Sequence, residues 1–122
     1  MKIHTTTRGL ELTNEISSYA EKRLSQVDKL IGEADLPHTS CDLFLVKETS
    51  HHQQGEIFSA EMILKMGKTT VFSKASESSI LASIDVAKDE LVRSLKHQKK
   101  RRFVLVRKGA LKVKEILKGL RF

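Results

Sequence analysis

Alternation of apolar and polar residues between residues 57 and 66 constrains the fold of this chain more than any other feature of its sequence. One parity of the segment carries only apolar side chains, namely Phe58, Ala60, Met62, Leu64 and Met66. The other parity is mostly polar and is interrupted by Ile57 and Ile63. Because successive side chains of a strand point to opposite faces, the pattern predicts a β-strand with one buried face.

Three further segments have the residue types of strands. Residues 2–6 alternate, residues 40–47 are mostly apolar, and residues 69–75 are rich in Thr, Val and Phe. Met66-Gly67-Lys68 supplies a turn before the last of these segments, since glycine accepts the backbone conformations that tight hairpins require. We therefore expect four strands, the last two joined as a hairpin.

Two other segments carry apolar residues at helical spacing. The first is expected to follow an N-cap at Thr13 and to end near Gly32, with an apolar stripe of Ile16, Ala20, Leu24, Val27 and Ile31. The second is expected to follow an N-cap at Ser76 and to reach His97 or beyond, with a stripe of Ile80, Ile84, Ala87, Leu91 and Leu95. Each helix has a single stripe, so the simplest burial places both on one face of the sheet.

The resulting order, β-α-β-β-β-α, predicts an α/β (α+β) fold with one four-stranded sheet. Strands two to four should form an antiparallel meander, and the helical crossover before strand two should place strand one parallel to a neighbour. We expect one domain over residues 1–100 and a basic C-terminal tail over residues 101–122. The part of the tail from residue 103 is expected to be helical only in part, because Gly109 and Gly119 weaken its helical pattern.

The net charge of +7 is concentrated at the carboxyl end of the chain. Residues 1–95 hold 11 Lys and Arg against 14 Asp and Glu, a balance of −3, whereas residues 96–122 hold 11 against 1, a balance of +10. Such asymmetry favours a polyanionic partner, either nucleic acid or an anionic membrane surface. The sequence has no apolar run long enough to span a membrane and no secretory signal, so we expect a cytoplasmic protein.

The most basic stretch lies at and beyond the end of the second predicted helix and contains Arg93, Lys96, His97, Lys99, Lys100, Arg101 and Arg102. Spacings of three, one and three would place Arg93, Lys96, His97 and Lys100 on one helical face, suited to a line of phosphates. Alternatively, a few cations complement the helix dipole while Asp89 pairs with Arg93. That alternative accounts for two or three charges and not for seven, so binding to a polyanion is the favoured interpretation.

Basic residues elsewhere are less informative. The first predicted helix carries Lys22, Arg23 and Lys29, which Glu21 and Asp28 offset. The predicted hairpin is flanked by Lys65, Lys68 and Lys74. These lysines either continue a basic strip onto the sheet edge or protect an edge strand from pairing with another chain.

The sequence contains none of the motifs that carry catalysis or bind nucleotide cofactors. His51 and His52 are adjacent and lack a third ligand at helical spacing, which favours a polar turn over a metal site. Cys41 is the single cysteine and is expected to be buried. We therefore expect a protein that is not an enzyme and that uses no metal, cofactor or small-molecule substrate.

Aromatic residues that could stack on bases are few. Phe44, Phe58 and Phe72 are expected to belong to the core, which would leave no aromatic platform on a sheet face. Recognition should then depend on backbone charge and on the shape of a structured RNA, and not on single-stranded bases.

Two separated segments match the pattern of a known family. The first runs from Arg8-Gly9-Leu10-Glu11-Leu12-Thr13 into Tyr19-Ala20-Glu21-Lys22-Arg23-Leu24. The second comprises Ala75-Ser76-Glu77, Ile84-Asp85-Val86-Ala87-Lys88-Asp89-Glu90-Leu91 and Arg93-Ser94-Leu95-Lys96. In this order the segments resemble the ribosome hibernation promoting factors and their ribosome-associated translation inhibitor relatives. The similarity covers about residues 1–100, and the chain resembles the short form, which lacks the dimerising domain of longer members.

The resemblance implies a non-enzymatic hibernation factor that acts in the stress response. Such a protein binds the small (30S) ribosomal subunit and its 16S rRNA near the decoding region, blocks mRNA and tRNA binding, and inhibits translation. By position, the resemblance implies RNA contacts at Lys22, Arg23, Arg93, Lys96 and Lys99. Glu90 and His97 stand where family members usually carry lysine, which would shift the basic patch toward residues 100–102 or change its affinity.

Charge and resemblance together select the candidate RNA-binding residues Lys22, Arg23, Lys74, Arg93, Lys96, Lys99, Lys100, Arg101 and Arg102. Two alternatives stay open on the sequence alone. One is a general module for structured RNA, and the other is a basic protein that associates with anionic membranes through its tail.

Overall fold

The computed structural model describes residues 1–49 and 55–107 of the chain. Its elements are β1 (Lys2–Arg8), α1 (Asn14–Asp28), a short 3-10 helix (Leu36–His38), β2 (Thr39–Thr49), β3 (Glu56–Met66), β4 (Thr69–Glu77) and α2 (Ile80–Arg107). The predicted β-α-β-β-β-α order is confirmed. The 3-10 helix occupies the loop that contains Pro37, a residue suited to the first turn of a helix.

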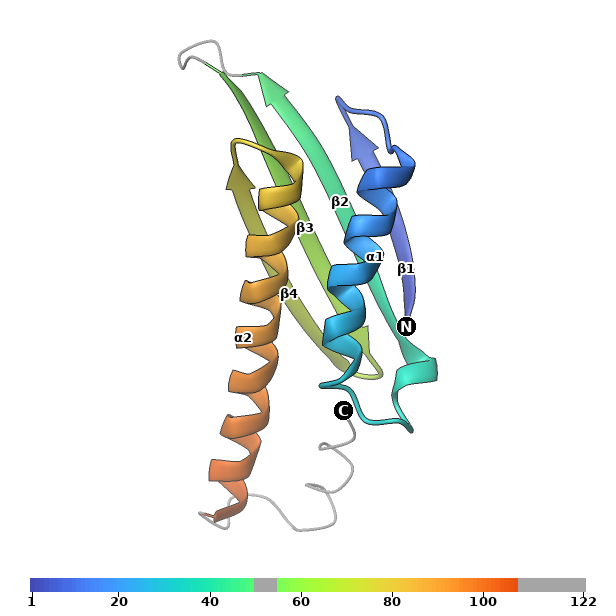
Figure 1. The fold of residues 1–122 in the computed structure, drawn as a ribbon. Helices are drawn as coiled ribbons and strands as arrows, with labels where there is room; N and C mark the ends of the chain where they lie inside the picture. The colour runs from blue at the N-terminus through green and yellow to red at the C-terminus, as the bar shows by residue number, and fades with distance from the viewer. Residues whose placement is uncertain (50–54, 108–122) are drawn as a thin grey trace.

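The four strands form one mixed sheet in the order β1-β2-β3-β4. β1 runs parallel to β2, with Ile3 opposite Cys41, whereas β2, β3 and β4 pair in antiparallel fashion, with Leu43 opposite Met62. The parallel pair follows from the crossover through α1, which returns the chain to the end of the sheet where β1 began. Both helices lie over one face of the sheet, α1 near β1 and β2 and α2 near β3 and β4 (Figure 1).

Helix α1 begins where the sequence predicts. The hydroxyl oxygen of Thr13 accepts a hydrogen bond from the backbone nitrogen of Ile16 at 3.2 Å, which confirms the N-cap. The regular helix ends at Asp28, before the predicted end near Gly32. Ile31 is nevertheless buried, so the apolar stripe continues into the core beyond the last helical turn.

Helix α2 begins later than predicted, and the expected N-cap at Ser76 is wrong. Ser76 pairs with Ser59 in the sheet, because β4 extends to Glu77. The cap is Ser79, whose hydroxyl oxygen accepts a hydrogen bond from the backbone nitrogen of Ala82 at 3.1 Å. Serine can cap wherever its backbone is extended, so the length of the strand pairing decided which serine was available.

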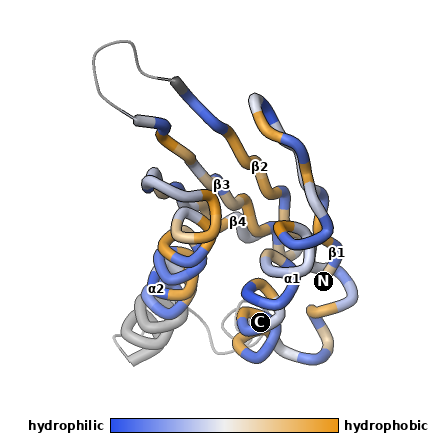
Figure 2. Tube along the Cα trace, turned by 45° about the horizontal axis from the view of Figure 1, so that its top comes forward, coloured by the Kyte–Doolittle hydropathy of each residue, from blue (hydrophilic) through white to orange (hydrophobic). Residues whose placement is uncertain are grey.

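The core fills the space between the helices and the covered face of the sheet. Both layers contribute fully buried side chains, among them Leu24, Leu43, Leu45, Met62, Leu64, Ile84, Leu91 and Leu95. Full burial of one such side chain contributes about 1.5–3 kcal/mol. Figure 2 shows hydrophobic and hydrophilic residues alternating along both helices, as expected of helices with one apolar stripe.

Cys41 is buried in this core, as predicted. Burial raises the pKa of its thiol to about 12, and the neighbouring carboxylate of Asp42 acts in the same direction. A protonated thiol is a poor nucleophile and a poor metal ligand, so Cys41 acts as a small apolar residue.

The uncovered face of the sheet exposes an aromatic residue that the sequence pattern assigns to the core. Phe72 is 53% exposed, because it alternates along β4 with Val71 and Ser73, which are buried on the helical side. Phe44 and Phe58 are only partly buried. The core assignment is therefore wrong for Phe72, and the sheet does present an aromatic side chain. β4 carries a large apolar residue on each of its two faces, Val71 on one and Phe72 on the other. Alternation alone therefore does not tell which face the helices cover.

Helix α2 continues through residue 107. Residues 103–107, where the tail is expected to be helical only in part, belong to α2. The rest of the predicted tail and the His51-His52 pair lie outside the described residues. Within the part of the chain that the structure describes, no helix is long and apolar enough to cross a membrane.

Candidate nucleic-acid interface

The structure places most of the candidate RNA-binding residues on the two helices. Lys22 and Arg23 lie on α1, and Arg93 and Lys96 lie on α2. Lys99, Lys100, Arg101 and Arg102 also lie on α2, but their side chains are outside the described residues. Lys74 is exposed on β4 and alternates with the buried Ser73 and Ala75, so it lies on the uncovered face of the sheet. The structure thus separates Lys74 from the candidates on the helices.

Lys74 borders a shallow hollow of about 420 Å³ on the uncovered face. Its lining combines the apolar side chains of Phe44 and Ile63 with the opposite charges of Arg8 and Glu61. Lys65, which the sequence pattern groups with Lys74, forms an ion pair with Asp42 at 3.2 Å. Because positive and negative groups alternate here, the uncovered face has no strong preference for a polyanion.

The outer side of α2 carries a cationic ridge that consists of Arg93, Lys96 and His97. Leu91 and Leu95 are fully buried, which sets the rotation of the helix and leaves all three ridge residues exposed. Arg93 pairs only within its own helix, and no ion pair among the described residues engages Lys96. The ridge therefore presents cationic charge to any ligand that approaches α2.

Arg93 pairs with Glu90 and not with Asp89, so the predicted pair is wrong. Arg93 Nη1 lies 2.7 Å from Glu90 Oε1, whereas Asp89 Oδ1 lies 3.2 Å from Lys88 Nζ. The side chains of Arg93 and Glu90 are 75% and 46% exposed. Exposed pairs of this kind contribute about 0–1 kcal/mol, so a phosphate can replace Glu90 as the partner of Arg93 at little cost.

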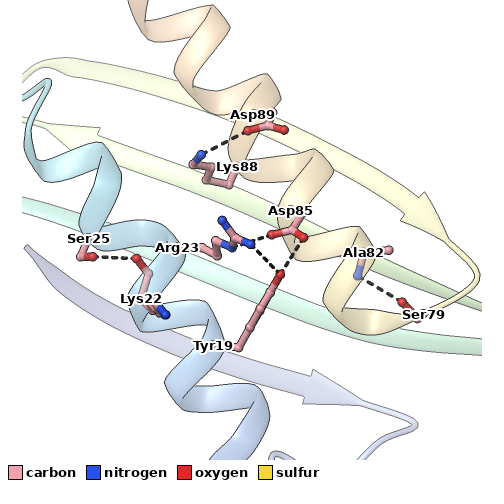
Figure 3. Close-up of polar contacts among 9 residues, drawn as sticks. All are labelled: Tyr19, Lys22, Arg23, Ser25, Ser79, Ala82, Asp85, Lys88 and Asp89. Carbon is pink, nitrogen blue, oxygen red and sulfur yellow. Dashed lines mark hydrogen bonds and ion pairs between the residues drawn. The ribbon is translucent and has the colours of Figure 1, made fainter.

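Between the two helices lies a polar cluster of Tyr19, Arg23 and Asp85, which we call the helix seam (Figure 3). The hydroxyl of Tyr19 donates a hydrogen bond to Asp85 Oδ2 at 2.6 Å and accepts one from Arg23 Nη2 at 3.1 Å. Arg23 Nε forms an ion pair with Asp85 Oδ1 at 2.8 Å. The guanidinium carbon also lies 5.1 Å from the centre of the Tyr19 ring. One carboxylate of α2 thereby holds two side chains of α1.

The seam further stabilises the positive charge that Arg23 carries at any ordinary pH. Its hydrogen bond with Tyr19 raises the pKa of Arg23 above its usual value, the negative charge of Asp85 acts in the same direction, and partial desolvation opposes both. The Arg23 side chain remains 36% exposed, so it is both anchored inside the protein and accessible from solvent.

The seam is the feature that reasoning from the sequence missed. Tyr19 and Arg23 are four residues apart on a predicted helix, a spacing that places them side by side. Asp85, however, follows 62 residues after Arg23, and nothing in the sequence pattern connects the two. Among the described residues, no three His, Cys, Asp or Glu side chains gather as metal ligands would.

Comparison with known proteins identifies relatives of this chain. The family model described as Sigma 54 modulation protein / S30EA ribosomal protein matches residues 3–102. Among solved structures, the chain is similar to the N-terminal domain of Protein Y from Thermus thermophilus, with 24% identity, a TM-score of 0.65, and coverage of 80% of this chain and 98% of that chain. It is also similar to a ribosomal subunit interface protein from Coxiella burnetii, with 15% identity, a TM-score of 0.64, and coverage of 82% and 99%. No curated protein sequence matches the chain.

Proposed function

Because the chain belongs to the Sigma 54 modulation protein / S30EA ribosomal protein family, we propose that it is a ribosome hibernation factor that binds the small (30S) ribosomal subunit. It contacts 16S rRNA near the decoding region, blocks the binding of mRNA and tRNA, and inhibits translation without catalysing a reaction. The Coxiella burnetii relative is named a ribosomal subunit interface protein, which supports a ribosomal partner for this chain.

The cationic ridge on α2 is the observation that carries this proposal. Arg93, Lys96 and His97 are exposed along one side of a helix whose opposite side is buried. The same helix continues through Lys99, Lys100, Arg101 and Arg102. A rigid helix with this density of cations matches the closely spaced phosphates of folded RNA and releases their counterions on binding.

Inhibition by such a protein is steric. A domain that occupies the decoding region excludes mRNA and tRNA for as long as it stays bound, so only its affinity and position matter. The charge on both helices supplies the affinity, and the fixed arrangement of α1 beside α2 supplies a shape that can distinguish one RNA surface from another.

A general module for structured RNA is the second candidate, since two helices that carry cations on a small sheet also suit the backbone of duplex RNA. The two candidates differ in selectivity. A hibernation factor should bind intact small subunits much more tightly than free duplex RNA of the same length, whereas a general module should bind both comparably.

The test is sedimentation of purified small subunits with the protein through a sucrose cushion, with and without mRNA and initiator tRNA. We expect stoichiometric pelleting that the two competitors reduce together. Anionic vesicles serve as a control for the membrane alternative. Absence from the ribosomal pellet at moderate salt would reject the hibernation proposal, and co-sedimentation with the vesicles would redirect it to membranes.

A further inference from the structure

Arg23 is anchored on one side and open on the other. A guanidinium has five N–H donors. Nε lies in an ion pair with Asp85 Oδ1 and one hydrogen of Nη2 is donated to Tyr19, so among the described residues the two hydrogens of Nη1 and one of Nη2 have no partner. Figure 3 shows the guanidinium wedged between Asp85 and Tyr19, with one terminal nitrogen pointing away from both.

We propose that Asp85 and Tyr19 are positioning residues, which hold the guanidinium of Arg23 with its free edge outward as a preorganised contact for an RNA phosphate. This proposal rests on the proposed function, because it requires that α1 faces RNA. It assigns to Asp85 a role in binding although its own charge repels RNA.

The geometry restricts Arg23 from three directions. Asp85 attracts it from α2, the Tyr19 hydroxyl accepts a hydrogen bond from it one turn away on α1, and the Tyr19 ring lies against it. Tyr19 is fixed in turn by its 2.6 Å hydrogen bond to Asp85. An arginine held in this way has already lost its rotamer freedom during folding, so little more is lost when a phosphate binds.

The neighbouring Lys22 is a cation of α1 that the helix seam does not hold, so it serves as a comparison for Arg23. Lys22 is exposed, and no ion pair among the described residues engages it. A lysine of this kind contributes its charge, but its flexible chain must be ordered upon binding. The seam therefore distinguishes two kinds of cation on α1, one preorganised and one without an ion pair among the described residues.

Replacement of Asp85 distinguishes positioning from simple electrostatics, because the two predict changes of opposite sign in the affinity for small subunits. Asp85→Asn removes one negative charge from a surface that faces RNA, so electrostatics alone predicts tighter binding to small subunits. Positioning predicts weaker binding, by about 3- to 10-fold, which is the cost of ordering one long side chain. The number of phosphates contacted stays the same, so the dependence of log Kd on log salt concentration should not change.

Asp89→Asn is the matched control. Asp89 is also an aspartate of α2, one turn from Asp85, but its ion pair is with Lys88 of the same helix, and it acts on Arg23 only through its charge, without a hydrogen bond or ion pair to α1 among the described residues. Its replacement changes the net charge by the same amount without releasing Arg23. We expect unchanged or tighter binding, by up to about fivefold.

Tyr19→Phe is the second variant and leaves the net charge unaltered. It removes the hydroxyl that accepts from Arg23 and donates to Asp85. Binding should weaken by about 2- to 5-fold, because the ring and Asp85 still restrain the guanidinium. Circular dichroism and thermal melting of each variant show that the domain remains folded at the temperature of the binding experiment.

The measurement is the Kd of each variant for purified small subunits at several salt concentrations. Weaker binding by both Asp85→Asn and Tyr19→Phe, without weakening by Asp89→Asn, supports positioning. Any other pattern in variants derived from a wild type that binds overturns the positioning role alone. Failure of the wild-type protein to bind would overturn the proposed function, and the positioning role with it.

Discussion

The two helices cover the same face of the sheet but use their charges differently. On α1, Arg23 is held by Tyr19 and by an aspartate of the other helix. On α2, Arg93 pairs only with an exposed glutamate of its own helix, and no ion pair among the described residues engages Lys96. The same residue type is thus held by the other helix in one case and only by its own helix in the other. The difference shows that two exposed arginines that count alike in the net charge can be held in different ways.

The largest expected effect is the loss of binding to small subunits when residues of the cationic ridge are replaced. The double variant Arg93→Glu, Lys96→Glu should weaken binding to small subunits by at least about 100-fold, because two charge-assisted contacts become repulsive. Sedimentation or filter binding measures the loss. The matched control is Lys2→Glu, Lys68→Glu, which makes the same change in net charge at two other exposed lysines. Equal losses in the two double variants would show that only net charge matters and would remove the distinction between the surfaces.

Substitutions of core leucines test whether the packing of α1 and of α2 onto the sheet contributes equally to the free energy of unfolding. Leu24 of α1 and Leu91 of α2 are both fully buried. Leu24→Ala and Leu91→Ala should each lower the free energy of unfolding by about 2–5 kcal/mol, since each leaves a cavity in the core. Urea denaturation measures both. A loss below 1 kcal/mol for either leucine would mean that its helix is held less tightly than its burial indicates.

Arg23→Gln tests whether Arg23 of α1 mainly stabilises the protein or mainly binds RNA. The side chains of Arg23 and Asp85 are each more than a third exposed, so we expect a loss of stability of no more than about 1 kcal/mol. The slope of log Kd against log salt concentration should fall by about one, as expected when one phosphate contact is lost. An unchanged slope would show that Arg23 serves the protein interior alone and that α2 supplies the charge for binding.

The smallest expected effect concerns the uncovered face of the sheet. Phe72→Ser replaces a side chain that is 53% exposed, so stability should change by no more than about 0.5 kcal/mol. Binding to small subunits should not change if the helices alone form the interface. A clear loss of affinity in this folded variant would show that the uncovered face of the sheet also belongs to the interface. The comparison would then be between the two faces of the sheet and not only between the two helices.

Cys41 permits a pH-dependent check that the core is closed. With the pKa of its thiol raised to about 12, the group stays protonated at pH 7 to 9, so thiol reagents should react with it only after denaturant is added. Rapid reaction at pH 8 in the native protein would mean that β2 is exposed to solvent much of the time, contrary to the burial of Cys41 in the core.

Periodicity predicted the elements and their arrangement with few errors. The alternation around Met62 and the helical spacing around Leu24 and Leu91 mark residues that are buried in the structure. Such patterns are reliable because burial of one face is the main source of stability for both kinds of element. The errors at Ser76 and Phe72 fell where local residue preferences permit two outcomes and contacts distant in sequence select one.

The candidate interface was predictable only in part. The concentration of charge at the carboxyl end of α2 is visible in the sequence, and the exposure of Lys96 follows from the burial of Leu95 next to it. That Arg23 is anchored was not predictable, because its partner belongs to the other helix. Nor could the sequence show that Lys74, grouped with the other cations by charge, lies on the face of the sheet that the helices leave uncovered.

The sequence by itself determined the order of elements, the two apolar stripes that must be buried, and the excess of positive charge near the carboxyl end. These are properties of single segments, and each follows from the periodicity or composition of neighbouring residues. Only the tertiary structure decided which arginine is held in place, which serine caps α2 and which phenylalanine is exposed. Those outcomes depend on contacts between segments far apart in the chain, and the energies that select them arise only when the helices pack side by side on the sheet.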